Sequence, residues 1–227
     1  MKKIATVYSD FPDKFGIPRQ GVLAPDLEAR IVMEPEYRSE DALRGIDGYD
    51  RLWIIWEFSE AIRENVSLTV RPPRLGGNMR MGVFATRSPF GPNPVGLTCV
   101  QLERVEWDTP LGPQLVIRGA DMMSGTPVYD IKPYLAYADS FPDARSGFAG
   151  DLCDKKLSVE IPAELSGKIP EDKLQGLTEA LALDPRPGYQ NDPERTYGIT
   201  YAGYNIQFRV SGDHLTVTGI NPAGGDR

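Results

Sequence analysis

The chain has 227 residues, a net charge of −7 and 41% apolar residues, which suits one or two folded domains with ordinary cores. Its 23 glycines and 20 prolines favour short strands and turns over long helices. The longest apolar run, residues 52–56, falls far short of the roughly 20 residues that a membrane helix needs, and the run after the N-terminal lysines is too short for a secretory signal. We therefore expect a soluble, cytoplasmic protein with no membrane partner.

Seven strands are predicted in the first 131 residues from apolar alternation and Gly/Pro punctuation. In chain order they are 3–9, 51–58, 66–70, 81–86, 95–106, 113–119 and 126–131. A loop over 14–26 follows the first strand, and a short helix within 37–50 is expected to begin after Ser39. Seven strands without a long helix between them predict a mostly antiparallel barrel or sandwich.

The composition changes after about residue 139, which predicts a first domain over 1–150 and a smaller α+β domain over 151–227. The second domain contains the best helix of the chain, which starts at Pro170 and places Leu174, Leu177 and Leu181 on one face. Three strands then follow as a meander with tight turns, over 196–201, 204–210 and 214–220.

Cysteine and histidine are too few and too scattered to predict a metal site. The chain has two cysteines, Cys99 and Cys153, and one histidine, His214, without the spacing of zinc ligands. Both cysteines are expected to be thiols in a cytoplasmic chain. His214 begins an alternating stretch, so we expect it at the surface of a strand end. A single histidine also weakens a Ser-His-Asp or Cys-His interpretation.

Positive charge is concentrated in one segment. Residues 65–102 contain no Asp or Glu but four arginines, Arg71, Arg74, Arg80 and Arg87, so the segment carries +4 and the remainder −11. Local charge decides where an anion docks, even though the net charge argues against a nucleic-acid binder. The stretch RPPRLGGNMR combines rigid prolines with flexible glycines and suits a loop that presents cations to a phosphate or carboxylate. A chance gap in acidic residues is the alternative.

The chain lacks the glycine motifs of Rossmann and P-loop folds, and two loop motifs at predicted strand ends remain. In GVFATRSPFGPNPVGL, Arg87 ends a predicted strand and a stiff proline-rich turn follows. In RGADMMSGTPVYDIKPY, the carboxylates of Asp121 and Asp130 could accept hydrogen bonds from ribose hydroxyls or balance a cation. Alternatively, Asp121 is a turn residue, and Asp130 with Lys132 is an exposed pair of little energetic value.

Four motifs resemble the TsaA-like family, whose characterised bacterial members are called TrmO. They are KFGIPRQ, RPPRLGGNMRMGVFATRSPFGPNPVGL, DMMSGTPVYDIKPY and DPRPGY, and they cover most of residues 4–140 and recur near 184–210. The resemblance implies a small non-Rossmann antiparallel β-barrel with a C-terminal domain. It further implies an S-adenosylmethionine-dependent homodimer that methylates N6 of threonylcarbamoyladenosine next to the anticodon of threonine tRNA.

The same resemblance implies the cofactor-binding residues. By motif position they are Gly21, Val22, Leu23, Ser59, Glu60, Arg87, Leu97, Arg118, Gly119, Ala120 and Asp121. Arg87 would face the cofactor from the end of a barrel strand, since a planar and always charged guanidinium suits a carboxylate and an adenine. With tRNA as the substrate, Arg71, Arg74 and Arg80 become candidates for phosphate contacts. No catalytic base is assigned, because Asp121, Asp130 and a water are all compatible with the reaction.

Three departures from the family pattern keep other functions open. Ser59 and Glu60 stand where a His-Gln pair is usual, Gly91 stands in place of the arginine of FRPNP, and Ser124 departs from the usual LDGTP. One alternative is a methyltransferase for another modified nucleoside or a small molecule. The other is a non-catalytic module that binds S-adenosylmethionine or RNA.

Overall fold

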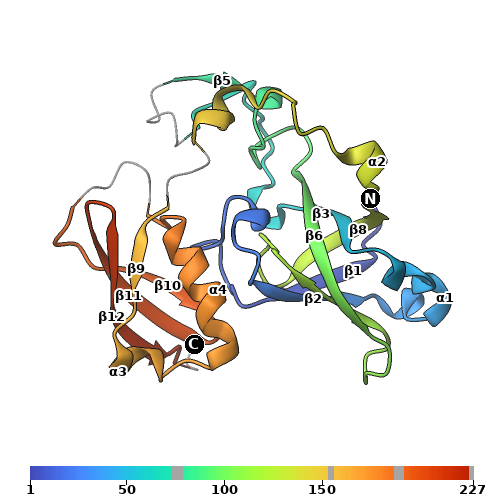
Figure 1. Cartoon of the computed structure of the whole chain (residues 1–227). Helices are drawn as coiled ribbons and strands as arrows, with labels where there is room; N and C mark the ends of the chain where they lie inside the picture. The colour runs from blue at the N-terminus through green and yellow to red at the C-terminus, as the bar shows by residue number, and fades with distance from the viewer. Residues whose placement is uncertain (73–78, 153–155, 187–191, 225–227) are drawn as a thin grey trace.

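The computed structural model describes residues 1–72, 79–152, 156–186 and 192–224, and a barrel and a second sheet covered by a helix lie side by side in it (Figure 1). Among these residues, no helix combines the length and the apolar content that a membrane span requires. His214 lies at the start of a strand with its ring next to Glu160 at the surface, as expected.

The first part is a closed barrel of six strands, each antiparallel to its neighbours. In order around the barrel they are β1 (Ala5–Ser9), β2 (Glu28–Met33), β7 (Gln114–Arg118), β6 (Val95–Glu106), β3 (Arg51–Glu57) and β8 (Thr126–Pro133). The mostly-β class and the antiparallel barrel are therefore confirmed. Closing the sheet leaves no unpaired edge strand, which suits a chain rich in short strands.

The barrel core follows from the period of two in its strands. Along β3, Leu52, Ile54 and Trp56 are buried while the residues between them are only half-buried. Opposite Trp56, β6 carries Gly96, where a Cβ would lie 2.2 Å from Cε2 of the indole. A side chain at position 96 would therefore displace the tryptophan ring from the core.

Two predicted barrel strands are wrong and one strand was missed. Residues 66–70 and 81–86 supply only a separate two-stranded ladder of β4 (Thr69–Val70) and β5 (Met81–Gly82). The side chains around it are largely exposed, so no buried face extends the strands, and a 3-10 turn, η6 (Val83–Ala85), follows β5 at once. The missed barrel strand is β2, whose alternation is masked by three consecutive buried residues at its end.

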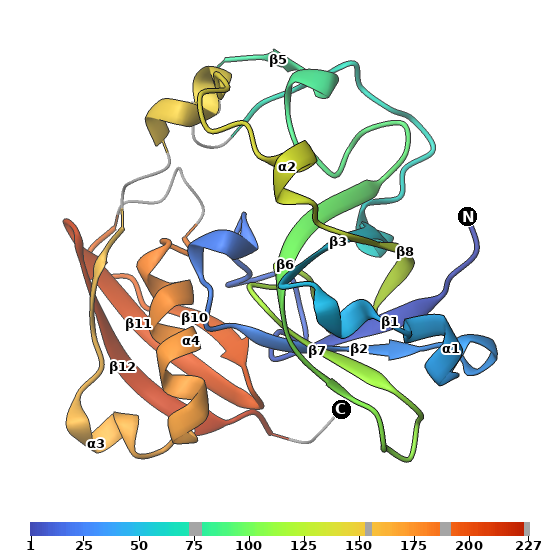
Figure 2. The same cartoon turned by 45° about the vertical axis from the view of Figure 1, so that its right-hand side comes forward.

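Four strands and one long helix form the second part (Figure 2). The predicted meander is confirmed as β10 (Tyr197–Tyr201), β11 (Tyr204–Ser211) and β12 (His214–Pro222), and β9 (Ser158–Glu160) adds a parallel strand beside β12. The predicted helix is α4 (Glu171–Ala182), with Pro170 before its first turn. Its buried residues include Leu177 and Leu181, which face the sheet as the leucine spacing predicted.

The core of the second part also contains residues from the first. Phe11, Ala24 and Leu27 are almost completely buried and pack with α4 and the meander. Polar contacts join the same surfaces: Asp10 pairs with Lys173 at 2.9 Å, and the amide of Asp26 donates to a carboxylate oxygen of α4 at 2.9 Å. The segment between β1 and β2 is thereby held against the helix.

The remaining elements are short helices that connect strands. They are η1 (Gly21–Leu23), η2 (Pro35–Tyr37), α1 (Glu40–Leu43), η3 (Ile46–Gly48), η4 (Ser59–Ala61), α2 (Ala136–Asp139), η7 (Gly147–Leu152) and α3 (Ala163–Ser166). The helix expected after Ser39 is thus α1, a single turn.

Candidate functional site

Three segments that are far apart in the sequence meet at one side of the barrel. They are η1, the turn that follows β7, and the first half of β6 itself. At their meeting point the backbones of Gly21 and Gly119 almost touch, since a Cβ on Gly21 would lie 1.8 Å from the carbonyl oxygen of Gly119. Gly119 has φ +73°, a left-handed conformation that glycine adopts without strain. These two glycines let η1 lie directly on the turn.

Asp121 lies at the centre of this cluster. Its Oδ1 accepts a hydrogen bond from Thr98 Oγ1 at 2.6 Å, and its Oδ2 accepts one from the amide of Gly21 at 3.3 Å. Burial raises the pKa of the Asp121 carboxyl above its usual value, while these hydrogen bonds and the charge of Arg87 act in the opposite direction. One carboxylate therefore links the end of β7, η1 and β6.

Thr98 and Trp56 support Asp121, and sequence reasoning missed both. The indole Nε1–H of Trp56 donates to Thr98 Oγ1 at 3.0 Å, and both side chains are buried. Their pairing depends on the register of β3 and β6. Trp56 on β3 lies opposite Gly96 on β6, and Thr98 is two residues further along β6. Thr98 looked like one more alternating strand residue, and nothing in the sequence connects it with Asp121.

Arg87 lies close to the cluster but does not end a barrel strand, so that part of the prediction is wrong. It follows η6 in an exposed loop, because β5 is only two residues long and the chain turns immediately after it. Its guanidinium donates to the side-chain carbonyl of Gln20, the residue before η1. Gln20 was also absent from the predicted set. The contact brings Arg87 to the entrance of η1.

Two of the predicted cofactor-binding residues have side chains that are already engaged within the fold. Arg118 binds Glu103 at 2.5 Å and Asp26 at 3.4 Å, so its guanidinium stabilises the outside of the barrel. Ala120 is buried in the barrel core, which leaves only its backbone for a ligand. Both residues shape the turn before Asp121 without directing a free polar side chain toward the cluster.

The other predicted residues divide into an apolar pair and a remote pair. Val22 and Leu97 are exposed by 61% and 54%, and they offer uncovered apolar surface beside the cluster. Ser59 and Glu60 lie on η4 with exposed side chains, and Glu60 approaches Lys14 at 3.9 Å. Within the described chain, no hydrogen bond joins this pair to the Asp121 cluster.

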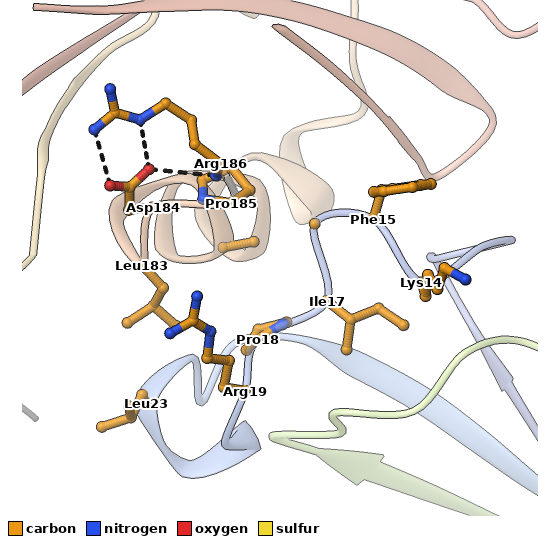
Figure 3. A pocket seen from close by; sticks show the side chains of 12 residues that line it. Lys14, Phe15, Ile17, Pro18, Arg19, Leu23, Leu183, Asp184, Pro185 and Arg186 are labelled. Carbon is orange, nitrogen blue, oxygen red and sulfur yellow. Dashed lines mark hydrogen bonds and ion pairs between the residues drawn. The ribbon is translucent and has the colours of Figure 1, made fainter. Parts of the chain in front are cut away.

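Two cavities near the predicted site differ in size and place. One of about 30 Å³ lies at the cluster, bordered by Val22, Arg118 and Gly119. One of about 300 Å³ lies between the loop before η1 and the end of α4 (Figure 3). Of the predicted cofactor residues only Leu23 borders the larger cavity, and the Arg186 guanidinium there is held by Asp184. Small-molecule sites usually enclose several hundred Å³, so the cavity at the cluster is far smaller than such a site.

The predicted RNA-binding arginines lie around the β4–β5 ladder. Arg71 directly follows β4 and Arg80 directly precedes β5, both with exposed side chains. Neither forms an ion pair with another described residue. Arg74 lies outside the described residues. The two arginines thus present charge to solvent beside the β4–β5 ladder, and β5 lies at the top of the view in Figure 1.

In the part of the chain that the structure covers, no three His, Cys, Asp or Glu side chains come together as metal ligands. Asp130 and Lys132 form the predicted exposed pair at 2.8 Å on β8.

Two family models match the chain in succession. The model described as the tRNA-methyltransferase O N-terminal domain matches residues 6–140, and that of the TrmO C-terminal domain matches residues 154–223. Together they cover the barrel and the second sheet.

Similar proteins support the same relationship. The chain is 37% identical over 231 residues to the tRNA (adenine(37)-N6)-methyltransferase of Escherichia coli (strain K12), and 97% of each protein is covered. It is 36% identical to the Pseudomonas aeruginosa protein RcsF, whose name provisionally assigns an S-adenosylmethionine-dependent methyltransferase, with 98% of this chain and 97% of that protein covered. A crystal structure of TrmO from Pseudomonas aeruginosa matches with a TM-score of 0.79 and 28% identity, over 97% of this chain and 96% of that one.

Proposed function

Since this chain belongs to the TrmO family, we propose that it transfers a methyl group from S-adenosylmethionine to N6 of an adenosine in tRNA. The observation that carries the proposal is the similarity to the Escherichia coli enzyme along 97% of both chains. The family's substrate, threonylcarbamoyladenosine beside the anticodon of threonine tRNA, is the substrate we propose for this chain.

The cluster around Asp121 fits such a cofactor. S-adenosylmethionine is a cationic amino acid joined to a nucleoside, and the cluster offers a half-buried carboxylate, a close glycine backbone and a neighbouring guanidinium. We propose that the cofactor is bound by residues of these segments and of η4. The proposed residues are Gly21, Val22, Leu23, Ser59, Glu60, Arg87, Leu97, Arg118, Gly119, Ala120 and Asp121.

The chemistry requires alignment more than charge stabilisation. When bound, S-adenosylmethionine supplies an electrophilic methyl group on a positively charged sulfur. The chain has to hold the adenine N6 in line with that group, which is an effect of position and orientation. The rigid contact of Gly21 with Gly119 and the anchoring of η1 by Asp121 would keep the positions of the binding groups constant.

The tRNA would approach over the β4–β5 ladder. Arg71 and Arg80 are exposed there, and the segment 65–102 to which they belong contains no acidic residue. Such cations attract phosphates even when the whole chain is acidic, because screening limits the influence of distant charges. We include Arg74 in this surface on the basis of the sequence.

A homodimer would complete the open cofactor site. Val22, Leu97 and Phe84 are large apolar residues exposed by 61%, 54% and 83%, and exposed apolar surface near a site suits a partner. A second copy is the partner that the family resemblance implies. We further propose two domains, 1–150 and 151–227, and a cytoplasmic location, where tRNA is modified. Light scattering at micromolar concentration tests the dimer, and a monomer mass would contradict it.

The test of the activity uses tRNA from a strain that lacks this gene. The purified protein is incubated with this tRNA and S-adenosylmethionine, and the threonine-tRNA nucleosides are analysed by mass spectrometry. The expected result is a mass increase of one methyl group on threonylcarbamoyladenosine. Methylation of a different nucleoside would keep the enzyme class but change the substrate. Cofactor binding without transfer to any RNA would favour a non-catalytic module.

A further inference from the structure

The direction of the hydrogen bonds around Thr98 follows from the chemistry of the groups. An indole N–H can only donate, so Trp56 donates to the Thr98 oxygen at 3.0 Å. Thr98 has a single hydroxyl proton, and its other partner is Asp121 Oδ1 at 2.6 Å. The hydroxyl proton therefore points at Asp121, and the three groups form a chain of donors that ends on the carboxylate.

Both oxygens of Asp121 act as acceptors. Oδ1 accepts from Thr98 and Oδ2 accepts from the amide of Gly21. A protonated carboxyl group would accept these two hydrogen bonds less strongly, because its oxygens carry less negative charge than those of a carboxylate. Both hydrogen bonds therefore favour the ionised carboxylate, whereas burial favours the neutral form and raises the pKa of Asp121.

This half-buried anion has no ion-pair partner within the described residues. Of the elements around it, β6 supplies the neutral hydroxyl of Thr98 and η1 supplies the neutral amide of Gly21. The charged group that faces it is Arg87, which is exposed and bound to Gln20. Arg118 is engaged by Glu103 and by Asp26. A half-buried carboxylate held ionised in this way suits a cationic ligand.

We propose that Trp56 and Thr98 are positioning residues that keep Asp121 ionised and oriented, so that its carboxylate pairs with a cationic centre of the methyl donor. The proposal rests on the proposed function, because it names the part of that cofactor which the cluster recognises. S-adenosylmethionine has two cationic centres, the sulfonium and the α-ammonium group, and both have the chemistry that Asp121 requires.

Three probes separate the possible partners of Asp121. S-adenosylmethionine carries both cations, S-adenosylhomocysteine carries only the ammonium, and methylthioadenosine carries neither but keeps the ribose and adenine. Calorimetry measures the affinity of each probe for wild type and for Thr98→Val, which keeps the shape of threonine but removes the hydroxyl. Thr98→Ser restores the donor and serves as the rescue variant. Thr126→Val removes another buried threonine hydroxyl of the barrel and controls for the loss of stability.

The expected result is a decrease of about tenfold or more in the affinity of Thr98→Val for S-adenosylmethionine, since this variant lacks a hydrogen bond to a charged group. Thr98→Ser and Thr126→Val should remain close to wild type. An unchanged affinity for S-adenosylhomocysteine would assign the sulfonium, and a parallel decrease would assign the ammonium. In both cases the affinity for methylthioadenosine should stay the same.

The pH dependence provides a readout that a purely structural role would not affect. Wild type should lose affinity for S-adenosylmethionine as the pH falls and Asp121 takes up a proton. Thr98→Val removes a donor to the ionised form, so the midpoint of this loss should move to higher pH in a titration that runs from neutral pH down through the ordinary carboxyl range. Asp121→Asn should bind weakly and show no such midpoint. In Trp56→Phe the pH midpoint should move in the same direction as in Thr98→Val, but by a smaller amount.

Three results would overturn the proposal. The first is an equal loss for methylthioadenosine, which would assign Asp121 to the ribose. The second is an unchanged affinity of a folded Thr98→Val, and the third is a loss of affinity with no change in the pH midpoint. If Thr98→Val does not fold, Trp56→Phe tests the same chain of hydrogen bonds from Trp56 through Thr98 to Asp121, with Thr98→Ser as the comparison. Wild-type affinity of Trp56→Phe at every pH would then refute the proposal. Failure of wild type to bind any probe would instead refute the proposed function.

Discussion

Arg87 provides the simplest test of the cofactor site at the scale of one residue. Its exposed guanidinium contacts Gln20 and acts on Asp121 through its charge. Replacing Arg87 by Ala should weaken S-adenosylmethionine binding about tenfold, the lower end expected for a hydrogen bond with a charged group, because solvent screens this position. Calorimetry measures the change. Arg44→Ala, an exposed arginine on the far α1 turn, is the control and should bind normally.

An unchanged dissociation constant for Arg87→Ala would remove this residue from the cofactor site. Arg87 was singled out because a lone arginine before a run of prolines is unusual, and the role proposed for it comes from the family resemblance. Thr98 and Gln20 were not predictable, since each acts through a partner that is distant in sequence. Sequence reasoning therefore found the residues with distinctive side chains and missed those that depend on strand register.

Gly91 tests a departure from the family pattern. Its φ is not among the positive values of the chain, and a Cβ there would meet only Asn93 O at 3.7 Å and a methyl group of Val83 at 4.0 Å. Gly91→Arg should therefore fold with an unchanged melting temperature. The added cation should tighten binding of tRNA or of the cofactor by about 1 kcal/mol. A steeper salt dependence by about one unit would identify a tRNA phosphate as the partner.

The opposite results for Gly91→Arg are equally informative. A melting temperature lowered by several degrees would mean that the loop around position 91 needs glycine for another reason. Unchanged melting with unchanged affinity for both ligands would show that this chain does not use the arginine that the family has there.

At the scale of elements, the position of η1 depends on a glycine. In Gly21→Ala the new Cβ would lie 1.8 Å from the Gly119 carbonyl oxygen, and backbone on both sides cannot yield as a flexible side chain would. Overpacking of this kind costs about 1–3 kcal/mol, or several degrees in melting temperature for a chain of this size. The moved η1 should also lose its amide contact with Asp121 and weaken cofactor binding.

Gly48→Ala is the matched control, because a Cβ at that position meets nothing within 4 Å. Thermal melts and calorimetry compare the two variants with wild type. If Gly21→Ala melts and binds as Gly48→Ala does, the close approach of η1 to the turn after β7 has no role in the site.

The elements also show why the strand prediction was only partly right. Residues 95–106 were found because apolar and polar residues alternate along much of the strand. Residues 113–119 were found as a short apolar run between a proline and a glycine, and the structure buries four consecutive residues there. Residues 81–86 have the composition of a strand but not its environment: Phe84 is 83% exposed and Val83 is buried in a 3-10 turn. Strand propensity records the fit of a side chain to a half-buried sheet, and only the fold decides whether such a sheet is present.

At the scale of the whole molecule, charge distribution should control tRNA binding. Arg71→Ala and Arg80→Ala each remove an exposed cation. Both positions lie in the segment 65–102, which contains no acidic residue. Each variant should bind tRNA more weakly, and its log–log salt slope should fall by roughly 0.7 to 0.9 for each phosphate that the protein no longer neutralises. Filter binding at several salt concentrations measures the slope. Arg209→Ala on β11 is the control, and slopes equal to wild type in all three variants would mean that the arginines do not contact phosphate.

The final prediction concerns the dependence of the barrel on the rest of the chain. Phe11 and Leu27 belong to the first 150 residues, yet each is only 2% exposed and packs in the core with α4 and the meander. A fragment of residues 1–150 would expose both, and burial of such a side chain contributes about 1.5–3 kcal/mol. The sum is a large part of the roughly 5–15 kcal/mol by which domains are stable. The fragment should therefore melt well below the full chain.

Removal of residues 151–227 should also weaken cofactor binding. The carbonyl oxygen of Leu27 accepts a hydrogen bond from the amide of Gly119 at 2.9 Å, so a loosened Leu27 frees the turn that leads to Asp121. We expect the fragment to bind S-adenosylmethionine more weakly than the full chain at a temperature where both are folded. Calorimetry and thermal melts on the two proteins make the comparison. Equal melting temperatures and equal affinities would mean that the barrel is self-sufficient, and that the contacts of Phe11 and Leu27 with α4 serve only to attach the second sheet.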